Sequence, residues 1–97
     1  MATLAYDDAA AEDLARLARF LAQEDPSGAV AVLELIHAAM RILEEHPLIG
    51  RPTGGSVREL VISFGATGYI ALYDYSPLAD HVQVYAIRHQ REVGFDD

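Results

Sequence analysis

The sequence predicts an α+β domain of the order β-α-α-β-β-β, in which a helical hairpin packs on a twisted, mainly antiparallel sheet. Two long segments in the first half repeat apolar residues every three or four positions, which is typical of amphipathic helices. Three segments in the second half are rich in β-branched and aromatic residues and are separated by turn residues. With 97 residues, we expect a single domain over 1–97.

The first half opens with a strand and a helix. Thr3–Tyr6 is an apolar run compatible with an opening strand, and Asp7 and Asp8 are expected to cap the helix that follows. That helix is predicted over Ala9–Glu24, because its apolar residues form one stripe: Ala10, Leu14, Leu17, Ala18 and Leu21.

A second helix follows almost without a linker. Asp25 and Pro26 suit the N-cap and the first position of a helix predicted over Ser27–Glu45. His46-Pro47 ends this helix, because the residue before a proline is displaced from the α region. The two helices therefore predict an αα-hairpin.

The second half begins with a loop and continues with strands. After the loop over 48–56, we expect strands over Val57–Phe64, Tyr69–Tyr75 and His81–Arg88, with turns at Gly65–Gly68 and Ser76–Asp80. Alternation in the last strand predicts one face with Val82, Val84 and Ala86, and another with Tyr85 and Ile87. The tail from His89 to Phe95 is compatible with a strand extension or a short turn.

Composition excludes several classes of protein. A hydrophobic content of 52% argues against intrinsic disorder, and the absence of cysteine excludes disulfides, thiolate zinc sites and cysteine nucleophiles. The net charge is −8, and all seven basic residues are arginines. This balance argues against nonspecific binding to DNA, RNA or an anionic membrane. We find neither a signal peptide nor an apolar run of eighteen residues, so we expect a soluble cytoplasmic protein.

Histidines and paired acids do not form a recognisable site in the sequence. His37, His46 and His81 have no neighbouring ligands at metal-binding spacing, and we expect no metal and no cofactor. The adjacent pairs Asp7-Asp8 and Glu44-Glu45 lie at helix ends, where capping and solvation explain them.

The arginines suggest a more specific surface. Residues 1–48 carry three arginines against nine acids, whereas the second half is neutral once the terminal Asp96 and Asp97 are set aside. Arg58, Arg88 and Arg91 are therefore candidates for a small anion-binding or partner-binding surface. The alternative, in which Arg88 and Arg91 pair with acids of the helices, stays open.

The tyrosines are expected mainly in the core of the sheet. Tyr69, Tyr73, Tyr75 and Tyr85 lie in predicted strands, and aromatic side chains also serve as interface anchors. We therefore add Tyr69 and Tyr73 to the candidate partner-binding residues, with Arg58, Arg88 and Arg91.

Nearly the whole chain resembles, in order, the RelE/ParE superfamily of toxins from bacterial type II toxin–antitoxin systems. The first half contributes the blocks YDDAA, DL, FLA and DPS, and the second half contributes LEEHPLIGRP, VREL, GY, LY and IRHQR. The combination of HPxxGRP, REL, GY and IRHxR is more specific than any one block. The superfamily fold agrees with the elements predicted above, and the resemblance also covers plasmid stabilisation proteins.

The resemblance implies two activities. RelE-like members cleave messenger RNA on the ribosome with basic residues of the sheet and C-terminus, and Arg58, His89 and Arg91 are the matching catalytic candidates. ParE-like members inhibit DNA gyrase without known hydrolytic chemistry. Ile70 replaces the arginine that commonly follows Gly-Tyr in the nuclease branch, and the lysines are absent. The ParE-like branch is therefore the better match, and the chain is not expected to be an enzyme.

The resemblance also implies a cognate antitoxin that neutralises the toxin. We expect this partner to wrap the helical hairpin or to add a strand to the open edge of the sheet. The acidic charge is unusual for the superfamily, and it suggests either an antitoxin with complementary positive charge or a diverged, non-toxic interaction module.

Overall fold

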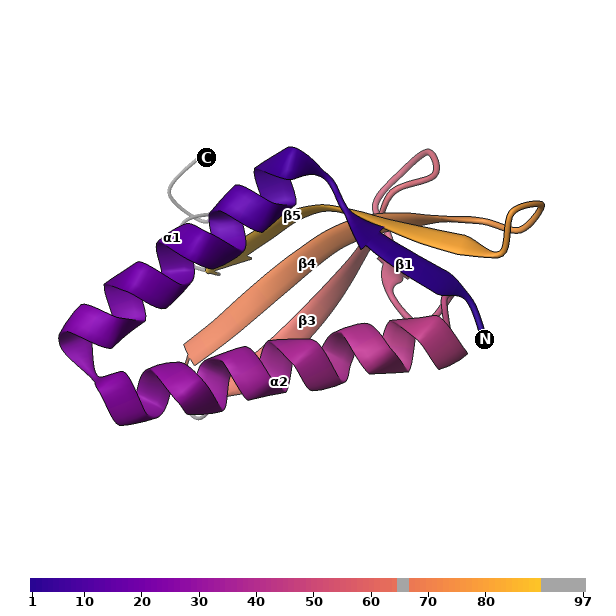
Figure 1. Ribbon diagram of the computed structural model, residues 1–97. Helices are drawn as coiled ribbons and strands as arrows, with labels where there is room; N and C mark the ends of the chain where they lie inside the picture. The colour runs from indigo at the N-terminus through magenta and orange to yellow at the C-terminus, as the bar shows by residue number, and fades with distance from the viewer. Residues whose placement is uncertain (65–66, 90–97) are drawn as a thin grey trace.

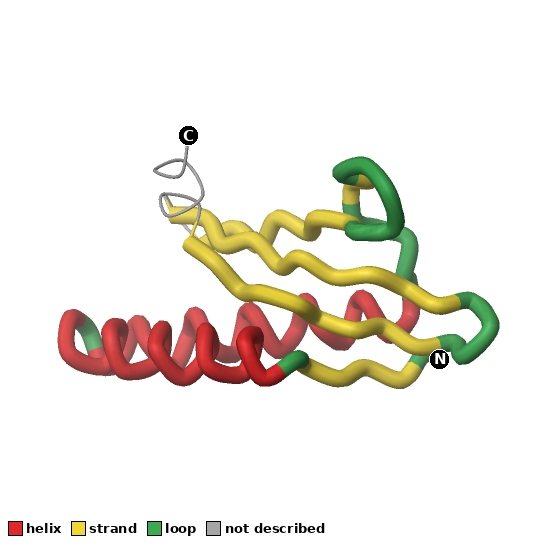
Figure 2. The backbone as a smooth tube through the Cα atoms, turned by 90° about the horizontal axis from the view of Figure 1, so that it is seen from above, coloured by secondary structure: helices red, strands yellow, loops and turns green. Residues whose placement is uncertain are grey.

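A computed structural model describes residues 1–64 and 67–89 of the chain. The described part has two layers, because helices α1 (Asp8–Glu24) and α2 (Pro26–Glu45) both lie on one face of a sheet (Figure 1). Seen from above, the two helices form a hairpin beside the curved strands (Figure 2). The five strands are β1 (Thr3–Tyr6), β2 (Arg51–Pro52), β3 (Arg58–Phe64), β4 (Thr67–Ser76) and β5 (His81–His89).

The strand order in the sheet is β1-β5-β4-β3-β2. Strands β2 to β5 pair antiparallel with their neighbours, and β1 pairs parallel with β5. A parallel pair needs a long crossover connection, whereas antiparallel strands are joined by short turns. The α+β class and the mainly antiparallel sheet that the sequence predicted are therefore confirmed.

Helix α2 provides much of the core. Its residues on the sheet side are buried because apolar positions recur at the helical period: Ala29, Val32, Ile36, Ala39, Met40 and Leu43. By length and composition, α2 is also the one described helix apolar enough to cross a membrane, a test that core helices of soluble proteins pass as well. In this structure 33% of the apolar window of α2 is buried, and Val30 and Ile42 are exposed.

Strand β5 corrects the predicted alternation. Val82, Val84 and Ile87 belong to the core cluster, so Ile87 shares a face with the two valines instead of lying opposite them. The register with β4 shifts between Leu72 and Tyr73, which is the signature of a β-bulge. Because a bulge inserts one extra residue into one strand, it reverses the face of every residue beyond it.

Several predicted boundaries are also wrong. Thr67 and Gly68 belong to β4 instead of a turn, whereas Gly65 and Ala66 lie outside the described residues. The predicted loop over 48–56 contains the short strand β2, which pairs with the start of β3. The tail beyond His89 is outside the described residues.

The predicted N-cap of α1 differs in its side chain. Asp7 occupies the cap position, and its backbone carbonyl accepts the N–H of Ala11 at 3.0 Å, but its carboxylate makes no cap hydrogen bond. The carboxylate instead accepts a hydrogen bond from the Gln83 amide, which the pairing of β1 with β5 brings nearby. Asp25 is likewise the N-cap of α2 without a side-chain cap bond.

Candidate functional site

The loop between α2 and β2 is held by a buried tyrosine. The hydroxyl of Tyr73 accepts a hydrogen bond from the N–H of Gly50 at 2.8 Å and donates one to the carbonyl of Pro47 at 2.8 Å. Tyr73 has no exposed surface, and burial raises the pKa of its hydroxyl above the usual 10.0. A Cβ on Gly50 would lie 2.5 Å from this hydroxyl, so the close approach requires glycine.

Arg58 holds the same loop from β3. Its Nη1 donates to the carbonyl of Gly50 at 2.8 Å and to that of Leu48 at 3.2 Å. In the register of the sheet, Arg58 lies directly opposite Tyr73. The two side chains therefore fix the loop from neighbouring strands, and at least part of the Arg58 guanidinium is used inside the protein.

The fixed loop presents apolar side chains outward. Leu48 is 59% exposed and Ile49 is 55% exposed, although their backbone is held by hydrogen bonds. Together they line a shallow groove at the end of α2 with four other residues: Glu45, His46, Pro47 and Tyr75.

A buried carboxylate joins α1 to β5. Asp13 is only 6% exposed, and its carboxylate accepts the backbone N–H of Ile87 at 3.0 Å. Strand β1 pairs with β5 only as far as Tyr6 and Val84, so Asp13 supplies an acceptor where the parallel ladder has ended. A buried backbone N–H without a partner would be costly, which explains an acid on the buried side of α1.

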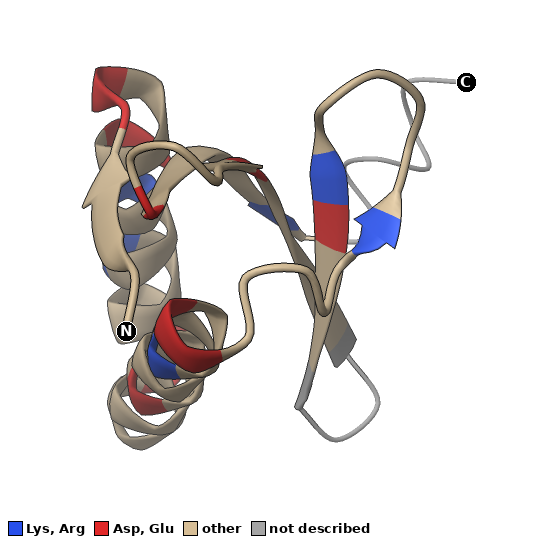
Figure 3. Cartoon of the chain, turned by 90° about the vertical axis from the view of Figure 1, so that its right-hand side faces the viewer, with Lys and Arg blue, Asp and Glu red and all other residues tan. Residues whose placement is uncertain are grey.

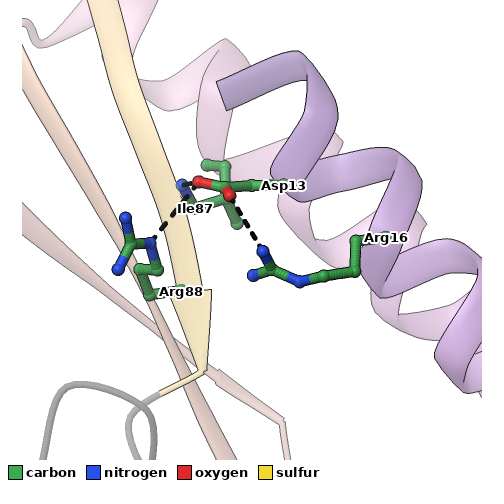
Figure 4. A network of polar contacts seen from close by, with 4 residues as sticks. All are labelled: Asp13, Arg16, Ile87 and Arg88. Atoms are coloured by element: carbon green, nitrogen blue, oxygen red, sulfur yellow. Dashed lines mark hydrogen bonds and ion pairs between the residues drawn. The ribbon is translucent and has the colours of Figure 1, made fainter. Parts of the chain in front are cut away.

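Two arginines approach the same carboxylate (Figure 4). Arg16 Nη1 lies 3.4 Å from one oxygen of Asp13, and Arg88 Nε lies 3.6 Å from the other. Arg88 Nε is buried and has no hydrogen bond to any described residue, so the ion pair with Asp13 is the contact that stabilises its charge. The alternative that Arg88 pairs with a helix acid is therefore confirmed.

The sheet separates the predicted catalytic residues. His89 lies opposite Tyr69 and Arg58 opposite Tyr73, four positions apart on β4 and on the same face. Strand rise and strand spacing then place the Cα atoms of Arg58 and His89 about 16 Å apart. Arg91, the third candidate, lies outside the described residues.

Arg88 is on the other face of the sheet from Arg58. It pairs with Ile70, and alternation along β4 turns Ile70 away from the face that carries Tyr69 and Tyr73. The described arginines thus form no single cationic cluster. In Figure 3 the acidic residues, in red, lie largely on the helical side, and some of the arginines, in blue, lie on the strands.

The predicted partner-binding tyrosines lie in the core. Tyr69 is 3% exposed and Tyr73 is fully buried, so the structure places both beneath the helices instead of on the surface. The ring of His89 packs edge-on against Tyr69, with centroids 5.2 Å apart. The expectation that Tyr69 and Tyr73 lie in the core of the sheet is confirmed.

A polar chain connects β1 to β5. The Thr3 hydroxyl lies 2.7 Å from His81 Nδ1, and His81 Nε2 lies 2.8 Å from the side-chain oxygen of Gln83.

Among residues 1–64 and 67–89, no three His, Asp or Glu side chains gather closely enough to hold a metal ion.

Sequence reasoning missed both Asp13 and the loop contacts. Asp13 is three residues after the buried Ala10 and so falls near the buried stripe of α1, a signal that was present in the sequence. The contacts of Tyr73 with Pro47 and Gly50 span more than twenty residues and leave no local signal.

Comparison with known proteins agrees with this fold. Residues 4–94 match the family described as the ParE toxin of the type II toxin–antitoxin system parDE. Two relatives from Caulobacter vibrioides are Toxin RelE3, 39% identical over 86% of this chain and 88% of the relative, and Toxin RelE1, 36% identical over 86% and 87%.

Solved structures share the architecture. The chromosomal ParDE system from P. aeruginosa matches with a TM-score of 0.73 and 20% identity, covering 92% of this chain and 96% of that one. The toxin–antitoxin complex RelBE2 from Mycobacterium tuberculosis matches with a TM-score of 0.62 and 24% identity, covering 91% and 96%. From the family match and the curated relatives, the chain belongs to the ParE/RelE family of toxins from type II toxin–antitoxin systems.

Proposed function

We propose that this toxin acts in the cytoplasm by binding a protein target, DNA gyrase, and that a cognate antitoxin neutralises it. The observation that carries the proposal is the use of Arg58: its guanidinium donates to the carbonyls of Leu48 and Gly50. A cation that holds a loop of its own chain is poorly placed to stabilise a scissile phosphate.

The separation of the nuclease candidates supports the same conclusion. Cleavage of RNA through its 2′-hydroxyl needs a base, an acid and cations that converge within hydrogen-bond reach of one phosphate. The Cα atoms of Arg58 and His89 are about 16 Å apart by strand geometry, and Arg88 lies on the opposite face of the sheet. A protein-binding mechanism needs no such convergence.

The charge of the chain also favours a protein target. The net charge is −8, and the sequence contains no lysine. Ribosomal and messenger RNA are polyanions, and binding to them gains most of its affinity from neutralised phosphates. The resemblance to the ParE branch, whose members act on gyrase, then supplies the target.

A ribosome-dependent endoribonuclease remains the second candidate, because both curated relatives carry the name RelE. It would use Arg58, His89 and Arg91. A diverged module without toxicity is the third candidate.

Two assays on the purified chain and one in cells separate the candidates. We expect the purified chain to inhibit gyrase supercoiling and to leave messenger RNA on translating ribosomes intact. In cells, induced expression of the chain should cause filamentation. The variant His89→Ala is the control, and it should retain inhibition. Ribosome-dependent RNA cleavage that His89→Ala abolishes would overturn the proposal, and normal growth with no inhibition would favour the non-toxic module.

A further inference from the structure

The exposed pair Leu48 and Ile49 stands on a loop that the fold holds in place. Tyr73 bonds to the loop at Pro47 and Gly50, and Ile49 N–H donates to the carbonyl of His46 at 3.1 Å. Exposed apolar side chains usually occur singly on a soluble protein. Here two adjacent ones are more than half exposed on an ordered backbone.

Such an arrangement suits binding. A loop already fixed in one conformation loses little conformational entropy when a partner covers it, so more of the apolar contact energy appears as affinity. Apolar anchors surrounded by a partly polar rim are the usual centre of a protein interface. The groove beside the pair, lined by Tyr75 and Pro47, has space for a partner side chain.

The charges around the groove indicate the chemistry of the partner. Glu45 lines the groove, and none of the described arginines lines it, although Arg58 holds the loop from β3 through the carbonyls of Leu48 and Gly50. The last turn of α2 contains no basic residue, so the negative end of the helix dipole is not compensated within that turn. The whole chain has a charge of −8, which attracts a cationic partner over longer distances.

We propose that the loop Pro47–Gly50 and the adjoining end of α2 dock a segment of the cognate antitoxin in which apolar side chains are flanked by lysine or arginine. Leu48 and Ile49 are its apolar anchors, Glu45 meets its positive charge, and Tyr73 and Arg58 position the loop. The inference rests on the proposal that an antitoxin neutralises the chain.

The binding experiment uses the full chain and the antitoxin encoded by the adjoining gene, with affinity measured by calorimetry. Wild-type toxin should form the complex, and the double variant Leu48→Ser/Ile49→Ser should bind at least about 30-fold more weakly. Leu78→Ser is the matched control, because Leu78 is a fully exposed leucine in the turn after β4 that does not line the groove. It should change affinity less than about twofold.

A second pair of variants tests the charge. Glu45→Gln should weaken binding at low salt and lessen its salt dependence, because screening reduces the attraction between exposed charges. Glu24→Gln is the control, since Glu24 ends α1 at the far end of the helical layer from Glu45 (Figure 1). Equal effects of the two variants would overturn the basic character of the segment.

The outcomes separate this inference from the function on which it rests. If wild-type toxin does not bind the antitoxin, the neutralisation proposal and the docking surface both fail. If wild type binds and the double variant binds equally well, only the docking surface is overturned. Circular dichroism and thermal unfolding should match wild type for each variant, because the substituted side chains are exposed.

Discussion

The carboxylate of Asp13 on α1 accepts the backbone N–H of Ile87 on β5 at 3.0 Å. The bond lies just beyond the point where β1 stops pairing with β5, so a helix side chain replaces the missing strand. It ties the helical layer to β5 across 74 residues of chain.

Removing this acceptor should destabilise the fold. We expect Asp13→Ala to lower the free energy of unfolding by about 2–3 kcal/mol, because the Ile87 N–H loses its acceptor and Arg88 loses its ion pair. Asp13→Asn keeps an acceptor oxygen and should cost less. Urea denaturation measures both, with the exposed Asp8→Ala as a control that should cost about 0.5 kcal/mol. Equal losses for Asp13→Ala and Asp8→Ala would contradict this role.

The hydroxyl of Tyr73 should matter more than that of Tyr75. Tyr73→Phe leaves the N–H of Gly50 and the carbonyl of Pro47 without their partner, at an expected cost of about 1–3 kcal/mol. Tyr75→Phe removes only an exposed hydrogen bond to Asp80 and should cost less than Tyr73→Phe, because water can replace that bond. Thermal unfolding compares the two variants, and similar melting temperatures would count against the loop contacts.

Arg58 should be a stabilising residue. Arg58→Ala removes donors to two carbonyls, and we expect a loss of about 1–3 kcal/mol. Arg51→Ala is the matched control on neighbouring β2, because it breaks an ion pair between the largely exposed Arg51 and Glu59 and should cost at most about 1 kcal/mol. Chemical denaturation gives both values. If Arg58→Ala left the stability unchanged, Arg58 would not stabilise the loop, and its guanidinium would again be a candidate for binding a partner or an anion.

The hydroxyl of Tyr85 should lose its proton at a higher pH than an ordinary tyrosine does. Its hydroxyl donates to Asp74 at 2.6 Å, and this bond raises the pKa of Tyr85 to about 12 from the usual 10.0. Between these two values the unfolded chain releases the proton while the folded chain retains it, so stability should fall as pH rises through this range. Below pH 10 the contribution is fully present.

Phenolate absorbance measures this titration as the difference between wild type and Tyr85→Phe. Asp74→Asn should lower the pKa of Tyr85 toward its usual value, whereas Asp80→Asn, which faces Tyr75, should leave it unchanged. A titration of Tyr85 near pH 10 in the wild-type chain would contradict the hydrogen bond.

The helices and the three long strands could be predicted because their signals are local. Apolar periodicity specified α2 to within one residue at its start, and His46-Pro47 marked its end. The bulge in β5 could not be predicted, since it depends on how β4 and β5 align. Nor could β2, because two residues have no periodicity of their own and become a strand only by pairing with β3.

The candidate site was less predictable than the fold. Composition and residue order identified Arg58, Arg88 and the tyrosines as residues of interest and carried the resemblance to the toxin family. They did not give the face on which each side chain lies, because strand register fixes that choice and a shift of one residue reverses it.

By itself, the sequence determined the class of fold, the hairpin and the family, all of which follow from local periodicity and the order of short motifs. Only the tertiary structure decided that Arg58 and Tyr73 hold the loop, that Arg88 pairs with Asp13, and that Leu48 and Ile49 remain outside. Hydrogen bonds and ion pairs act over about 3–4 Å, so their partners are defined only after folding brings distant segments together.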